Sequence, residues 1–199
     1  MKKLLGIALA SAAAGLCLSA LKKASDEQTV ELSPVKRSSP NKKAILVVSF
    51  GTSYAQTREK TIGAIEEDFR SAFPEYTIRR AFTSKMIIKK LRERDGIEVD
   101  TVAQALEKLE AEGYSTVICQ PTHVMGGFEF DDVKREVENW KGRFDHIACG
   151  WPLLTSSEDY EQVTEALVQE FSDIPSDAAL VLMGHGTEHP ANATYPALD

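Results

Sequence analysis

Short apolar runs alternate with amphipathic segments along the chain from Lys42 onward. Short apolar runs that alternate with helical periodicity predict β-strands over 44–50, 76–82, 116–120 and 147–150. Apolar residues three and four positions apart predict helices over 58–73, 84–94, 100–113, 130–140 and 160–171, with Ser84 and Asp100 as expected N-caps. A fifth apolar run, over 179–183, predicts a further strand that ends at His185.

The regular order of strands and helices indicates the fold class. A strand, a helix and a second strand in sequence imply a right-handed crossover and a parallel sheet covered on both faces. The expected architecture is therefore a doubly wound α/β fold.

The first forty residues differ from the rest of the chain. Residues 1–20 combine Lys2 and Lys3, an apolar run over 4–18 and small residues at the end, which is the pattern of a signal peptide and is short for a membrane span. Residues 21–41 resemble a linker. We therefore expect a protein exported to the periplasm and not inserted in the membrane after cleavage, since Leu16 makes Cys17 a poor lipidation site.

The remaining chain divides into two parts. Residues 42–175 are expected to form a first α/β domain, and residues 176–199 to begin a second one that this chain does not complete. The 199 residues, 43% hydrophobic and 27% charged, suit a globular protein of this size.

Charge and motifs exclude two classes of ligand. The formal net charge is −7, and it becomes −9 without residues 1–20, so binding to nucleic acid is not expected. The chain contains neither a dinucleotide fingerprint nor a phosphate-binding loop, so no nucleotide cofactor is expected. A local basic run could still serve an anionic substrate, although a solvated helix face explains most of its members: Arg79, Arg80, Lys85, Lys89, Lys90, Arg92 and Arg94.

The segment Gly184-His185-Gly186 carries the first candidate for chemistry. The apolar run before it would place His185 at a strand tip, and ligands bind beyond the carboxyl ends of strands in open α/β sheets. Neutral imidazole binds divalent cobalt, nickel, iron or zinc. A turn histidine without a ligand is the alternative.

A second cluster follows the third predicted strand. His123 and Glu129 lie in and after a glycine-bearing loop, and a histidine with a carboxylate suits a site that handles metal and protons. His123 could equally pack within the loop, and Asp131 and Asp132 are expected only to favour a helix N-terminus. After the first strand, the backbone amides of Thr52 and Ser53 could face an anion such as a carboxylate.

Cys119 and Cys149 each lie within an apolar run. We expect both to be free, buried side chains rather than a disulfide, because free cysteine is among the most buried residue types.

Four blocks of sequence together resemble a known family, the anaerobic sirohydrochlorin cobaltochelatases of the class II chelatases. They read VVSFGTSY, RAFTSKMIIKKLRERDGIEVDT, PLLTSSEDY and MGHGTEHPAN, and the resemblance spans residues 43–199. It implies two similar α/β domains around a tetrapyrrole cleft, and a lyase that inserts Co²⁺ into sirohydrochlorin for cobalamin biosynthesis. His185 would be the catalytic, metal-binding histidine and Glu129 its acidic, metal-binding partner, while the family's second metal-binding histidine has no counterpart in this chain.

Several points stay open at this stage. Imidazole and carboxylate also accept Fe²⁺ or Ni²⁺ in place of Co²⁺. Thr52, Ser53 and His123 are candidates for substrate binding. The sequence does not decide whether the protein forms a homo-oligomer. An exported relative could be a chelatase for a periplasmic pool, or a tetrapyrrole or metal carrier that no longer catalyses insertion. We expect the 199-residue polypeptide to fold in its first domain and to metallate its substrate poorly.

Overall fold

Four parallel strands form the centre of the fold. The computed structural model describes residues 41–175, 177–179, 181, 183–184 and 186–198. Its strands are β1 (Lys43–Ser49), β2 (Thr77–Phe82), β3 (Thr116–Pro121) and β4 (His146–Cys149), in the order β2-β1-β3-β4. Every neighbouring pair is parallel, so the predicted parallel α/β fold is confirmed.

Helical segments connect the strands. They are α2 (Ala55–Arg58), the π-helical turn η1 (Glu59–Gly63), α3 (Ala64–Ala72), α4 (Lys85–Asp95), α5 (Val102–Ala111), α6 (Phe128–Asn139), α7 (Ser157–Glu170), the 3₁₀ turn η2 (Pro190–Ala193) and α8 (Thr194–Leu198). The three segments α2, η1 and α3 follow one another without a break.

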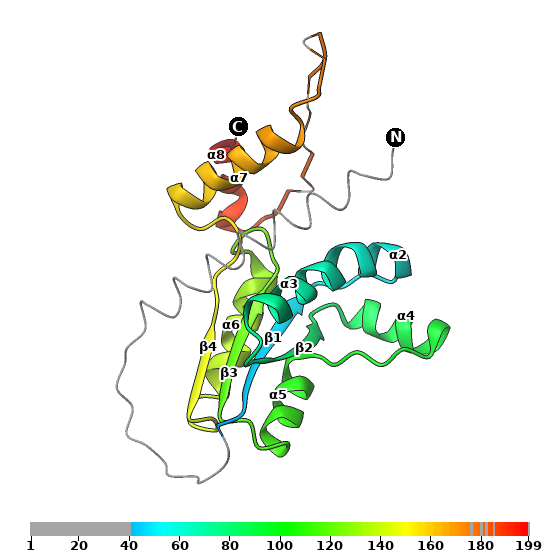
Figure 1. Ribbon diagram of the computed structural model, residues 1–199, viewed down its shortest axis with the longest axis vertical. Helices are drawn as coiled ribbons and strands as arrows, with labels where there is room; N and C mark the ends of the chain where they lie inside the picture. Colours follow the sequence, from blue (N-terminus) through cyan, green and yellow to red (C-terminus); the bar gives the residue numbers. More distant parts are fainter. Residues whose placement is uncertain (1–40, 176, 180, 182, 185, 199) are drawn as a thin grey trace.

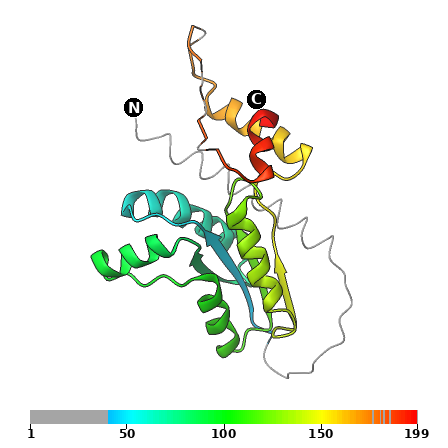
Figure 2. The same ribbon diagram turned by 180° about the vertical axis from the view of Figure 1, so that it is seen from behind.

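Helices cover both faces of the sheet, because the central strands β1 and β3 carry apolar side chains on both faces. On one face, Leu46 and Val117 pack with apolar residues of α5 and α6, and α6 is seen crossing this face in Figure 2. On the other face, Ile45 and Val47 pack against Ile65 and Phe69 of α3, which lies in front of the sheet in Figure 1. The doubly wound arrangement follows from this two-sided burial.

Capping residues set the helix boundaries around α4 and α5. Ser84 caps α4 by accepting a hydrogen bond from the Ile87 amide, as predicted. The expected cap of α5 was wrong by one residue, since Thr101 forms a capping box with Gln104. Asp100 instead binds the Lys108 ammonium group at 2.7 Å, so its carboxylate is not available to the helix amides.

The last two helices lie beyond the carboxyl ends of the strands, at the top of Figure 1. The α7 helix begins with its own capping box, formed by Ser156 and Asp159. The Tyr160 hydroxyl donates to Thr194 Oγ1 at 3.2 Å and so joins α7 to α8. Both helices therefore lie at the edge of the sheet where α/β folds bind ligands.

The predicted fifth strand is absent from the described part of its range. Ala179, Val181 and Met183 belong to no strand, and Val181 and Met183 are 82% and 95% exposed. A strand needs a neighbour to accept its backbone hydrogen bonds, and the four-stranded sheet provides none to these residues. An apolar run alone was therefore not sufficient to predict a strand here.

The predicted signal peptide and linker lie outside the described residues, apart from Asn41. Within the described residues, no helix is both long enough and apolar enough to cross a membrane.

Candidate functional site

Three loops meet at the carboxyl edge of the sheet, after β1, β3 and β4. The Thr122 hydroxyl donates to Ser49 Oγ at 2.9 Å and ties the ends of β3 and β1 together. The amides of Leu153 and Leu154 donate to the carbonyls of His123 and Val124 at 2.9 and 2.8 Å, which joins the β3 and β4 loops. The loops that carry the predicted site residues are thus held in a fixed relation to each other.

The imidazole of His123 is largely buried, although it is a polar group. Both of its ring nitrogens are buried, and neither has a hydrogen-bond partner among the described residues. Burial lowers the pKa of this imidazole, and the negative charge of Glu129 offsets the shift only in part. The ring is therefore neutral near pH 7, which is the form that binds a metal ion or accepts a proton.

Glu129 lies in the first turn of α6 rather than in the loop before it. Its side chain is exposed, and it acts electrostatically on His123, so the structure brings these two predicted residues into one site. An exposed carboxylate on a helix N-terminus can attract a cation or accept protons from a bound ligand.

Exposed apolar side chains surround these polar groups. Phe50, Val124, Phe128 and Trp151 follow the ends of adjacent strands and are between 36% and 58% exposed. We call these four residues the apolar platform. Large exposed apolar side chains at the ligand-binding edge of an α/β sheet favour contact with the apolar part of a ligand.

Thr52 and Ser53 form a tightly bonded turn after β1. Thr52 Oγ1 accepts the Tyr54 amide at 3.3 Å, and the Arg58 guanidinium donates to the Thr52 carbonyl at 3.1 Å. The Ser53 side chain is buried, and its carbonyl accepts a hydrogen bond from Arg94. These contacts hold the turn in place, and they leave the side chain of Ser53 buried rather than at the surface.

Carboxylates neutralise much of the predicted basic run. Ion pairs join Arg79 to Glu112, Arg80 to Glu66, Lys89 to Glu93 and Arg94 to Asp95. The hydrogen bond and charge of Arg94 lower the pKa of Asp95, against the opposing effect of its desolvation. The basic run is therefore mainly a solvated surface with internal ion pairs.

His185 itself lies outside the described residues, but both flanking glycines are described. A Cβ atom on Gly184 would collide with the ring of Tyr195, and Gly186 has a φ of +73°, which favours glycine. The close approach that Gly184 permits is therefore with Tyr195 of α8.

The sequence pattern did not single out His189, which the structure brings to the carboxyl edge of the sheet. His189 Nε2 lies 3.2 Å from Asp131 Oδ2, so the segment after Gly186 contacts the first turn of α6. The prediction that Asp131 serves only the helix N-terminus was therefore incomplete. Pro190 at the first position of η2 was the available signal, because it marks His189 as a helix cap.

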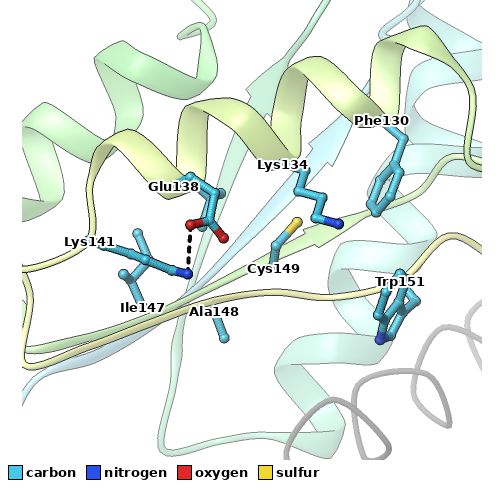
Figure 3. A pocket seen from close by; sticks show the side chains of 9 residues that line it. Phe130, Lys134, Glu138, Lys141, Ile147, Ala148, Cys149 and Trp151 are labelled. Carbon is cyan, nitrogen blue, oxygen red and sulfur yellow. Dashed lines mark ion pairs between the residues drawn. The ribbon is translucent and has the colours of Figure 1, made fainter. Parts of the chain in front are cut away.

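A small pocket of about 70 Å³ lies between α6 and β4. Figure 3 shows Cys149 and Lys134 beside it, with Phe130 and Trp151 at one end and the Lys141–Glu138 ion pair at the other. Ligand pockets measure roughly 300–1,000 Å³, so this one is too small for a tetrapyrrole. No cluster of three metal-ligating side chains occurs within the described residues, which do not include His185.

Comparison with known proteins relates this arrangement to one family. Residues 43–199 match the family described as cobalt chelatase (CbiK). The chain is 48% identical over 158 residues to sirohydrochlorin cobaltochelatase of Salmonella typhimurium. The aligned residues make up 79% of this chain and 60% of that relative. It is 35% identical over 170 residues to sirohydrochlorin cobaltochelatase CbiKC of Nitratidesulfovibrio vulgaris, and this alignment covers 84% of this chain and 60% of that relative.

The chain thus spans about 60% of the length of both relatives. The resemblance inferred from the four sequence blocks is confirmed, because the match extends over the same residues, 43–199. With its parallel α/β sheet and its histidine and carboxylate at the carboxyl edge, this protein belongs to the cobalt chelatase (CbiK) family.

Proposed function

We propose that this protein is a lyase that inserts Co²⁺ into sirohydrochlorin for cobalamin biosynthesis. The names of both relatives support this substrate and this metal. One structural observation carries the proposal: the neutral His123, the exposed Glu129 and the apolar platform occupy loops and a helix start at the carboxyl edge of one sheet.

The chemistry of insertion requires three things of the protein. As Co²⁺ enters the macrocycle it replaces two pyrrole N–H protons, so the charge of the macrocycle is unchanged and two protons must be accepted by a base. The Glu129 carboxylate can accept these protons in turn and pass them to water, because its side chain is exposed. A neutral imidazole at His185 would hold the ion before transfer, and the apolar platform would contact the macrocycle.

Fe²⁺ and Ni²⁺ are further candidate substrates in this proposal. Imidazole and carboxylate ligands accept all three ions, and affinity rises from Fe²⁺ through Co²⁺ to Ni²⁺ for a given site. Insertion rates measured with each ion at equal free concentration would rank them.

Two substitutions test the proposed roles. Replacing His185 by alanine (His185→Ala) should abolish insertion, because the ion loses its imidazole ligand. Glu129→Gln should slow insertion without unfolding the protein, since this side chain is exposed. The rate is followed by the change in absorbance as sirohydrochlorin becomes metallated.

A matched control comes from His146, which is exposed at the amino end of β4, away from the site. His146→Ala removes the same imidazole group and should leave the rate unchanged. Wild-type turnover in His185→Ala, with circular dichroism showing an intact fold, would show that the site is assigned wrongly.

The pattern of residues 1–20 favours a second candidate, an exported carrier of tetrapyrrole or metal. A carrier would bind sirohydrochlorin at the same edge without accelerating insertion. Binding followed by fluorescence, together with an insertion rate equal to that without protein, would support the carrier over the chelatase.

A further inference from the structure

Three contacts hold the imidazole ring of His189. Its Nδ1 accepts the Ala191 amide at 3.0 Å, and its Nε2 lies 3.2 Å from Asp131 Oδ2. The ring meets the edge of Phe128 with centroids 4.9 Å apart at 84°, and only 17% of the side chain is exposed. A side chain held by a cap, a carboxylate and an aromatic ring has one fixed orientation.

The hydrogen bonds also fix the ring's proton. Because Nδ1 accepts from a backbone amide, the proton of the neutral ring is on Nε2, which donates it to Asp131. This contact joins residues 58 positions apart in the sequence. It connects the segment after Gly186 to the first turn of α6, and the same turn contains Glu129.

We propose that His189 is a positioning residue for the reaction, which acts through Asp131 to hold the segment after Gly186 against the turn of α6 that contains Glu129. His185 precedes His189 by four residues, and Glu129 precedes Asp131 by two. The inference rests on the proposed chelatase function.

Two other contacts involve described residues near His189 in the sequence, Gly184 and Thr187. Gly184 packs against the Tyr195 ring, and Asn192 Oδ1 accepts the Thr187 amide at 3.2 Å. Gly184 thus lies against α8, while the His189–Asp131 bond holds the residues after Gly186 against α6. A displacement of about 1 Å in a reacting group can lower a rate roughly 100-fold.

The experiment compares four variants. His189→Asn retains a side-chain acceptor for the Ala191 amide, because asparagine is a strong N-cap, but it is too short to reach Asp131. Asp131→Ala removes the other partner, and the double variant removes both. Asp132→Ala is the matched control, since Asp132 is its neighbour in α6 and pairs only with the exposed Arg135 among the described residues.

Each single variant should lower kcat for cobalt insertion about 10- to 100-fold with little change in KM, because alignment rather than binding is lost. The double variant should match the singles, since both remove the same interaction. Asp131→Ala should also raise hydrogen exchange at the Asn192 amide, which donates to the His189 carbonyl. Asp132→Ala should change neither quantity.

Three results would overturn the proposal: unchanged exchange at Asn192 in Asp131→Ala, raised exchange with unchanged kcat, or an equal loss in Asp132→Ala. A wild-type protein that inserts no cobalt would refute the proposed function alone, because the exchange measurement still tests the His189–Asp131 contact.

Discussion

The thiols of Cys119 and Cys149 show how position decides the chemistry of single residues. They are neighbours on β3 and β4, and both are free. Burial raises the pKa of Cys149 to about 12, with a small opposing effect from Lys134, and burial also raises that of Cys119. Both side chains therefore remain uncharged thiols at neutral pH and are poor metal ligands and nucleophiles.

These thiols should lower stability in alkaline solution. Above pH 9 the unfolded chain loses thiol protons that the folded chain retains, up to about pH 12 for Cys149. The free energy of unfolding should therefore fall with rising pH, by about 1.4 kcal/mol per pH unit for each thiol. Urea denaturation between pH 8 and 11 measures the slope.

Cys149→Ala provides the control for this slope, because it removes one thiol while lysine and tyrosine titration is unchanged. Its stability should fall less steeply above pH 9 than that of the wild type. Identical slopes in the two proteins would show that the thiol of Cys149 ionises as readily in the folded state as in the unfolded one.

At the scale of elements, side-chain caps decide where helices begin. The capping boxes of α5 and α7 each satisfy amides that the first helical turn leaves without partners. Partial burial raises the pKa of Asp159, but hydrogen bonds from Ser156 and Thr155 outweigh this effect and lower it overall. The carboxylate therefore caps α7 in its charged form.

Thr101 and Asp100 allow a direct test of cap assignment. Thr101→Ala should lower the free energy of unfolding by about 1 kcal/mol, because the Gln104 amide loses its acceptor. Asp100→Asn should cost less, since it weakens only a surface ion pair with Lys108. Chemical denaturation of both variants decides between them, and a larger loss in Asp100→Asn would reverse the assignment.

At the scale of the whole molecule, one sheet with helices on both faces leaves its carboxyl edge to the functional loops. Apolar cores fill both faces, whereas the apolar platform, Glu129 and the His189–Asp131 contact lie at this edge. The α7 and α8 helices lie beyond the same edge (Figure 1). The core and the proposed site thus occupy different parts of the molecule.

Export is a proposal about the whole molecule. A charged start, an apolar run and small residues within 1–20 favour cleavage by a signal peptidase. We propose a mature N-terminus near Leu21 and recovery from the periplasm, measured by N-terminal sequencing after fractionation. Intact Met1 on protein from the cytoplasm would contradict export, whereas a lipid on Cys17 would show a membrane-anchored form.

The sequence by itself determined the parallel α/β fold and most of its elements. The four strands agree with the predicted ranges to within one residue at each end. The reason is clearest for β1, because a strand that is buried on both faces must be apolar along most of its length. The prediction of Ser84 as an N-cap also needed only local sequence, since the helix that it caps begins one residue later. The family followed from short blocks of sequence and required no geometry.

Only the tertiary structure decided the features that depend on distant neighbours. The run at 179–183 is apolar, yet its described residues form no strand because no sheet edge receives them. Burial makes His123 neutral, and burial depends on how the loops pack. His189 and Asp131 meet across 58 residues, so no local pattern could pair them. Local spacing predicts elements, whereas contacts between elements set the protonation and orientation of the side chains within a site.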